Sequence, residues 1–313
     1  MTTTTAPQPP AAPPAAPAPQ PAATNERDGS IAGAQAGRLV IRNVDKNFAN
    51  SQVHTLRDIS LACEPGEFVV VVGPSGCGKS TLLNIAAGML PADGGEVTLD
   101  GRPVTAPGPE RAMVFQDHGL FPWLTAEQNV EFGLKMAGMP KSERQDRVAN
   151  ALKMVHLTRS GKKLIHELSG GMRQRVAIAR ALIVDPAVLL MDEPFASLDA
   201  QTRTLLHQQL QELWVQTKKT ILFVTHSVGE AVRLADRIIV LHAHPGRIRR
   251  EVRIDLPHPR AIDGREIAEL VSLVRREIED EVNRVNAQEA ADFWKPQAPA
   301  DLGAAIGDMG GGI

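Results

Sequence analysis

The segment Gly73 to Thr81, which reads Gly-Pro-Ser-Gly-Cys-Gly-Lys-Ser-Thr, constrains the fold more than any other part of the chain. It follows the apolar run Phe68 to Val72 and precedes a helical pattern of apolar residues. A Gly-x-x-x-x-Gly-Lys-Ser loop between a buried strand and a helix is typical of a phosphate-binding P-loop. The sequence therefore predicts a nucleotide site on a strand–loop–helix unit.

The residues of this loop have distinct expected roles. The glycines let backbone N–H groups turn inward toward phosphate, and the helix N-terminus adds its positive dipole end. Lys79 can reach the terminal phosphates, and the Ser80 hydroxyl suits Mg²⁺. The predicted nucleotide-binding residues of the loop are Gly73, Pro74, Ser75, Gly76, Cys77, Gly78, Lys79, Ser80 and Thr81.

Polar residues follow two further buried strands. The apolar run Val188 to Met191 ends in Asp192-Glu193, and Thr220 to Val224 is followed by Thr225-His226. Ligands of open α/β sheets bind where parallel strands end, so these side chains are expected at one sheet edge. There Asp192 is placed to hold Mg²⁺, Glu193 to polarise an attacking water, and His226 to contact a γ-phosphate.

The order of strands and helices favours a mostly parallel, three-layer α/β core. Short strands before and after the P-loop predict a small antiparallel sheet beside it, with a hairpin built on Asp100-Gly101. Phe48 lies in this part of the chain, and its flat ring could stack on a purine. A buried core position is the alternative interpretation of Phe48.

Composition sets the domain limits. Residues 1–37 form a Pro- and Ala-rich tail, expected to be disordered, and residues 38–255 form the nucleotide-binding domain. Residues 256–313 are expected to form a C-terminal extension, with one amphipathic helix of about 25 residues and a frayed end. The net charge of −2 gives no basic field that points to nucleic acid, and the two cysteines suggest no disulfide framework.

The ordered motifs resemble the ATP-binding subunits of ABC transporters over roughly residues 38–255. The resemblance rests on the P-loop, Gln116 at a strand end, Leu168-Ser169-Gly170-Gly171, Asp192-Glu193, Ser197-Leu198-Asp199 and His226.

The resemblance implies a P-loop ATPase with an antiparallel β subdomain and an inserted helical subdomain at about 118–175. It implies that Gln116 joins Ser80 and Asp192 around Mg²⁺ and that Glu193 is the general base, with His226 as the γ-phosphate sensor. It also implies that Phe48 stacks on adenine. Ser169, Gly170 and Gly171 of one subunit would close on ATP held by a second, with Asp199 at that interface.

Four further segments resemble the nitrate/sulfonate/taurine group of importers: Phe121 to Thr125, Met172 to Arg175, Pro194 to Asp199 and His244 to Ile248. The partners implied are a second copy or a paralogous ATPase subunit, transmembrane permease subunits and, indirectly, a solute-binding protein. The exposed apolar run Leu120 to Leu124 fits permease docking. The location implied is peripheral, on the cytoplasmic face of the inner membrane.

Other ATPase classes fit the sequence less well. A GTPase would need a guanine-reading Asn-Lys-x-Asp segment, which the sequence lacks, and a DNA-repair ATPase would carry a long coiled coil before Ser169. A translation-factor type would carry two such cassettes. The ATPase subunit of an exporter remains an alternative, because the same kind of ATPase domain drives both directions of transport.

Overall fold

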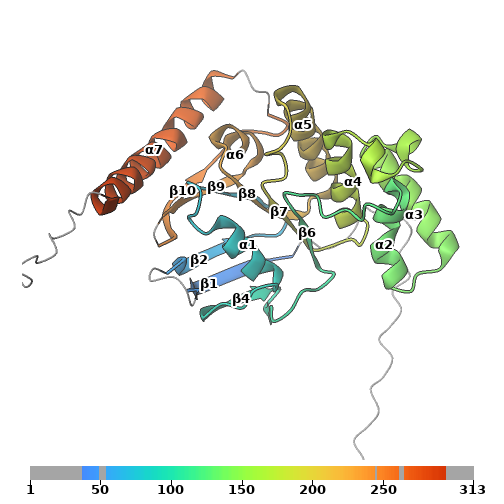
Figure 1. Ribbon diagram of the computed structural model, residues 1–313, viewed down its shortest axis with the longest axis horizontal. Coiled ribbons are helices and arrows are strands. Elements are labelled where there is room, and N and C mark those ends of the chain that lie inside the picture. Colours follow the sequence, from blue (N-terminus) through green and yellow to red (C-terminus); the bar gives the residue numbers. More distant parts are fainter. Residues whose placement is uncertain (1–36, 49–53, 244, 261–263, 294–313) are drawn as a thin grey trace, which may run out of the picture. The chain divides into compact units, whose positions relative to one another are not determined.

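The computed structural model describes residues 37–48, 54–243, 245–260 and 264–293, with the backbone alone over 280–293. The expected N-terminal tail and frayed C-terminus lie outside the described residues, except for Gly37. Figure 1 shows a large sheet with helices on one side and a smaller sheet with α1 on the other.

The larger sheet has six strands in the order β10-β9-β3-β8-β7-β6. All neighbouring pairs are parallel except β10 with β9. Its strands are β3 (Phe68–Val72), β6 (Arg111–Val114), β7 (Val188–Asp192), β8 (Thr220–Thr225), β9 (Arg237–His242) and β10 (Arg247–Arg253). Because strands buried on both faces carry continuous apolar runs, β3, β7 and β8 could be recognised from sequence.

The smaller sheet is antiparallel, with the order β2-β1-β4-β5. Its tight β4–β5 turn places Asp100 at φ 49° and Gly101 at φ 76°, the left-handed conformations of a type I′ hairpin. This confirms the hairpin predicted from Asp100-Gly101. The strands are β1 (Leu39–Lys46), β2 (Leu56–Cys63), β4 (Gly94–Leu99) and β5 (Arg102–Pro103).

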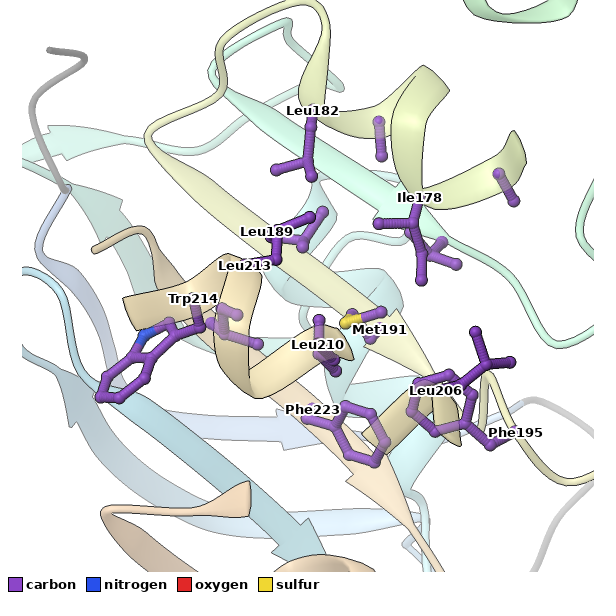
Figure 2. Close-up of a cluster of buried hydrophobic side chains, with 14 of the residues drawn as sticks. Ile178, Leu182, Leu189, Met191, Phe195, Leu206, Leu210, Leu213, Trp214 and Phe223 are labelled. Atoms are coloured by element: carbon purple, nitrogen blue, oxygen red, sulfur yellow. The ribbon is translucent and has the colours of Figure 1, made fainter. Parts of the chain in front are cut away.

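The two faces of β3 build two separate cores. Phe68, Val70 and Val72 pack into a cluster with residues of the helices on one side, whereas Val69 and Val71 pack with α1 and the antiparallel sheet on the other. The helices of the first cluster include α4 (Gly170–Leu182), α5 (Ala200–Thr217) and α6 (Val228–Leu234), and α1 spans Lys79–Ala87. Figure 2 shows aromatic and aliphatic side chains filling the space between α4, α5 and the sheet.

The helical region expected from about Thr125 to Leu157 is two helices, α2 (Ala126–Met136) and α3 (Lys141–Met154). Thr125 begins α2 with a capping box, in which its hydroxyl accepts from Gln128 N and the Gln128 side chain accepts from Thr125 N. The break comes at Gly138, which has φ 74°. Two short 3₁₀ turns, Thr158–Ser160 and Ile165–Glu167, lead on to α4.

The chain after β9 departs from one expectation. The apolar run Ile238 to Leu241 predicts a last strand, which is β9, but β10 follows it and pairs antiparallel with it at the sheet edge. The amphipathic helix expected from Ile267 onward is α7 (Arg265–Phe293), whose Val274 is fully buried in the first core. Glu277 of α7 bonds Arg249 and Arg250 of β10, so the C-terminal helix is tied to the edge strand. No helix of the described residues is long and apolar enough to cross a bilayer.

Candidate nucleotide-binding site

The P-loop joins β3 to α1 as predicted, and two of its glycines have positive φ. Gly78 is the residue before α1, with φ 93°, and Gly76 has φ 78°. Side chains other than glycine rarely adopt these angles, so the loop geometry depends on both glycines. Lys79 begins α1 and is buried, and its ammonium donates to the carbonyl oxygens of Gly73 (3.0 Å) and Pro74 (2.9 Å). Two backbone carbonyls of the loop therefore fix the position of the Lys79 ammonium.

Asp192, the last residue of β7, lies beside the start of α1. The Ser80 hydroxyl donates to its Oδ1 atom at 3.0 Å. Burial raises the pKa of the Asp192 carboxyl above its usual value; the Ser80 bond and the Lys79 charge oppose this, and the Glu193 charge adds to it. A half-buried carboxylate with one hydroxyl partner is stabilised when a cation joins it.

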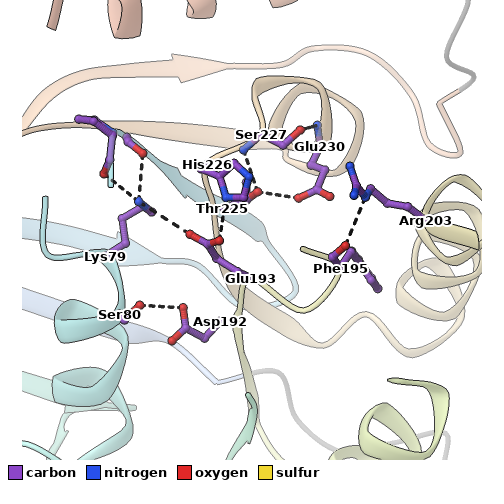
Figure 3. A network of polar contacts seen from close by, with 12 residues as sticks. Lys79, Ser80, Asp192, Glu193, Phe195, Arg203, Thr225, His226, Ser227 and Glu230 are labelled. Carbon is purple, nitrogen blue, oxygen red and sulfur yellow. Dashed lines mark hydrogen bonds and ion pairs between the residues drawn. The ribbon is translucent and has the colours of Figure 1, made fainter. Parts of the chain in front are cut away.

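Glu193 is held in an unusual backbone conformation at the same edge. Its φ is 42°, and its N–H donates to Val224 O of the neighbouring strand at 3.0 Å. Such angles are costly for a residue with a side chain and gather at functional sites. Its Oε2 atom accepts from Nδ1 of His226 at 2.7 Å, and Oε1 lies 3.9 Å from Nζ of Lys79. Figure 3 shows Lys79, Ser80, Asp192, Glu193 and His226 together.

The donor set at this edge fits Mg²⁺ bound together with phosphate. Among the described residues no group of three or more His, Cys, Asp or Glu side chains could hold a metal unaided. Mg²⁺ commonly takes one or two protein oxygens and completes its shell with phosphate oxygens and water. Ser80 and Asp192 supply such a pair.

A second predicted group of residues forms a separate cluster. Ser169 precedes α4, where its hydroxyl accepts from Met172 N, and Asp199 precedes α5, where its carboxylate accepts from Thr202 N. Gly170 and Gly171 pack directly on Leu198 and Thr202, so the starts of the two helices lie against each other. The bonds of both side chains are made to the helix that each one precedes, Ser169 to α4 and Asp199 to α5.

Two further predicted residues lie apart from the P-loop contacts. Gln116 follows β6 and is exposed. Phe48 follows β1 and is 43% exposed, with the Lys46 ammonium 5.7 Å from its ring centroid. An exposed ring does not suit a core position, which removes the alternative interpretation of Phe48.

A buried polar network behind His226 was not found from sequence. The Thr225 hydroxyl donates to Glu230 Oε2 (2.6 Å), and His207 Nε2 lies 3.1 Å from Glu230 Oε1. Arg233 contacts the other ring nitrogen of His207 and can only donate, so Nε2 carries the proton. Burial raises the pKa of Glu230, but the bonds from His207 and Thr225 outweigh it and leave that pKa below its usual value. One sequence signal could have revealed this network: Glu230 follows the strand-end Thr225 by five positions and lies among the apolar residues of a helix.

The loop after Gln116 is also held by residues that sequence reasoning missed. Asn129 of α2 accepts from Phe121 N at 2.8 Å and donates to Phe121 O at 3.1 Å. Arg180 of α4 donates to the carbonyl oxygens of His118 and Gly119. Asn129 is fully buried on the apolar face of α2. A polar residue at such a position in the sequence could have indicated that it holds a neighbouring loop. The Asn129 contacts connect the loop to α2, and the Arg180 contacts connect it to α4, the helix that Ser169 precedes.

The raised pKa of Asp192 predicts a stability effect that depends on pH. A raised pKa in the folded state gives stability that is present below the unfolded pKa and is lost as pH rises through the folded value. Asp192→Asn should therefore unfold at a higher temperature than the wild type at pH 8 without Mg²⁺, and the gap should shrink toward pH 4. Calorimetric melting curves across this range test it; an equal or lower melting temperature at pH 8 contradicts the assigned cost of the buried charge.

Comparisons with known proteins agree with this geometry. The family model described as ABC transporter matches residues 56–196. An ABC transporter ATP-binding protein of Methanocaldococcus jannaschii is 48% identical over 78% of this chain and 92% of the relative. The nitrate import ATP-binding protein of Synechocystis sp. is 48% identical over 70% and 83% of the two chains. The taurine import ATP-binding protein of Roseobacter denitrificans is 47% identical over 69% and 82%.

Solved structures give the same fold. A dimeric ATP-binding cassette in a post-hydrolysis state, bound to ADP and Pi, has a TM-score of 0.62 and 35% identity, covering 70% of this chain and all of that chain. The cbiO1 protein of Clostridium perfringens, part of the ABC transporter complex cbiONQ, has a TM-score of 0.65 and 27% identity, covering 80% and 98%.

The strand–loop–helix unit with Asp192 and Glu193 at the neighbouring strand end defines a P-loop nucleoside triphosphatase of the α/β class. Within that class, the chain belongs to the ABC transporter family as an ATP-binding subunit.

Proposed function

We propose that this chain hydrolyses ATP to power import of a small solute through a separate membrane permease. The observation that carries the proposal is the single cluster of Lys79, Ser80, Asp192, Glu193 and His226 at one sheet edge. The relatives named for nitrate and taurine import favour a small anionic or zwitterionic solute of that kind. ATP-dependent uptake by the reconstituted transporter tests this proposal, and uptake that continues without ATP would contradict it.

ATP hydrolysis needs positioning and charge stabilisation more than covalent chemistry. The loop amides and Lys79 bind the β- and γ-phosphates. Ser80, Asp192 and Gln116 would hold Mg²⁺, which supplies charge neutralisation of the phosphate oxygens. Glu193 orients a water and accepts its proton as the water oxygen bonds to the γ-phosphorus. The bond from that phosphorus to the β,γ-bridging oxygen breaks, and ADP and phosphate leave.

His226 has a supporting role at the γ-phosphate. Its Nδ1 atom donates to Glu193, and its side chain is 56% exposed, so the far side of the ring is accessible from the sheet edge. The network of Thr225, Glu230 and His207 fixes the backbone on which His226 stands. This support keeps the side chains of His226 and Glu193 in one orientation while the γ-phosphate is cleaved.

The site is completed by a second copy. Ser169, Gly170 and Gly171 lie at the N-terminus of α4, which suits an anion, and they contact residues at the starts of α4 and α5. In a head-to-tail pair each cradle closes on the ATP of the partner copy, with Asp199 at the interface. The dimeric cassette bound to ADP and Pi supports this arrangement. The isolated chain should bind ATP readily and hydrolyse it slowly at low concentration.

An apolar surface on α2 and the loop before it is suited to the permease. Trp123 and Met136 are each 72% exposed, and the ring of Phe121 contacts the rings of Trp123 and Phe132 in tilted arrangements. A cleft of about 670 Å³ between α2 and α3 lies in the same helical region, lined by Glu127, Lys141, Gln145, Val148 and Lys162 among others. Docking there would place the chain on the cytoplasmic face of the inner membrane as a peripheral subunit.

The docking surface makes a measurable prediction. Trp123→Ser is expected to release most of the chain from washed membranes of cells that carry the permease, because it removes the aromatic ring that is most exposed among the described side chains. Val215→Ser on α5, which removes another exposed apolar side chain, should stay membrane-bound. Sedimentation followed by quantitative blotting measures both. Equal membrane retention of the Trp123 variant and the wild type would contradict this docking surface.

A further inference from the structure

The turn between β9 and β10 lies directly behind the P-loop. Gly246 is buried in this turn and donates from its N–H to Thr55 O at 3.0 Å, while its carbonyl accepts from Arg57 N at 2.9 Å. These bonds form a parallel bridge between Gly246 and Leu56 at the start of β2. The turn is thereby fixed to the strand that also borders the P-loop.

Gly246 has no room for a side chain. A Cβ atom there would overlap Cys77 O and would lie 2.9 Å from Thr55 O and 3.0 Å from a methyl group of Leu56. Real Cβ contacts essentially never fall below 3.0 Å, and the two oxygens belong to the backbone, so no rotamer change relieves them. The φ of Gly246 lies outside the left-handed region. The requirement for glycine is therefore one of space alone.

The peptide that Gly246 contacts belongs to the phosphate-binding loop. A trans peptide is planar, so when the Cys77 carbonyl points toward Gly246 the N–H of Gly78 points the opposite way. Gly78 is also backed by Leu56, because a Cβ on Gly78 would lie 2.6 Å from a methyl group of Leu56. The Gly78 N–H is the last of the loop before α1 begins, where P-loop amides face phosphate.

We propose that Gly246 is a positioning residue for nucleotide binding, which holds the Cys77–Gly78 peptide with its N–H toward the phosphates. The inference rests on the proposed ATP site. It adds to that site a residue that follows Gly78 by 168 positions in the sequence. It also gives Gly246 a physical role beyond its place in a segment that resembles one subgroup of importers. A larger residue at 246 would have to displace the loop peptide or break the bridge to β2.

The test is Gly246→Ala with Gly264→Ala as the matched control, since among the described residues a Cβ on Gly264 would meet Ile267 alone, at 3.8 Å. We expect Gly246→Ala to weaken ATP binding at least tenfold by calorimetry and to raise KM more than it lowers kcat. We expect Gly264→Ala to bind ATP as the wild type does. ATP affinity of Gly246→Ala within twofold of the wild type would overturn the inference.

Two measurements separate this inference from its premise. If the wild-type chain does not bind ATP, the proposed function fails; if it binds ATP and Gly246→Ala binds it equally, only the role of Gly246 fails. Hydrogen exchange on the wild-type chain needs no variant and so covers the case in which Gly246→Ala does not fold. The amides of Arg57 and Gly246 should gain protection when ATP is added, and unchanged protection of both would overturn the inference.

Discussion

Glu193→Gln is expected to bind ATP with nearly wild-type affinity and to lose ATP turnover by on the order of 10²–10⁴-fold, the usual contribution of a general base. The amide keeps the shape of the side chain but cannot accept a proton from the attacking water. Lys79 and the loop amides are expected to bind the phosphates. Lys79 loses the charge of Glu193, 3.9 Å away, but keeps its bonds to the carbonyls of Gly73 and Pro74. The loss should therefore appear in kcat while the ATP dissociation constant stays within a fewfold range.

Phosphate release and calorimetric ATP titration measure the two quantities on the same preparation. Glu96→Gln is the matched control, because Glu96 is exposed and its ion pair with Arg42 lies on the antiparallel sheet. Turnover of Glu193→Gln at the wild-type rate would remove Glu193 from the role of base. A loss of ATP binding that equals the loss of turnover would instead assign Glu193 to binding.

Lys79→Ala is expected to weaken ATP binding by ten- to a hundredfold or more. A hydrogen bond to a charged group is worth about 1.5–3 kcal/mol, and each 1.4 kcal/mol is a factor of ten in affinity. The substitution also removes the ammonium donor from the carbonyls of Gly73 and Pro74, and Pro74 O keeps the longer bond from Cys77 N, which loosens the loop.

Fluorescent-nucleotide titration of Lys79→Ala gives the affinity directly. Lys153→Ala, on an exposed position of α3, keeps the same change of charge away from the loop and should bind ATP as the wild type does. Unchanged binding by Lys79→Ala would discredit the P-loop assignment itself.

The catalytic edge was predictable because its residues follow buried strands. Val188 to Met191 and Thr220 to Val224 are apolar runs of strand length, and parallel strands end at one sheet edge. The polar residues after them therefore meet, as Glu193 and His226 do. The P-loop was predictable for a related reason, since its glycines, lysine and serine are local in sequence.

The features that sequence reasoning missed depend on contacts between distant segments. The edge strand β10 reads Arg-Ile-Arg-Arg-Glu-Val-Arg, and charged side chains on an exposed edge hide its strand character. His207 and Glu230 stand 23 positions apart, and only the packing of α5 against α6 shows that they are paired. In the sequence Gly246 has the pattern of an ordinary turn glycine, because only the folded structure brings it close to Cys77 O.

The most direct test of the account is the mass of Glu193→Gln in solution with and without saturating ATP and Mg²⁺, measured by light scattering after gel filtration. Under the proposed head-to-tail pairing one chain supplies half of each site, because Ser169 to Gly171 of a second copy would form the other wall. Because Glu193→Gln is expected to bind ATP without hydrolysing it, the mass should rise from that of one chain to that of two when ATP is added. A mass that stays at one chain under saturating ATP would contradict the shared site.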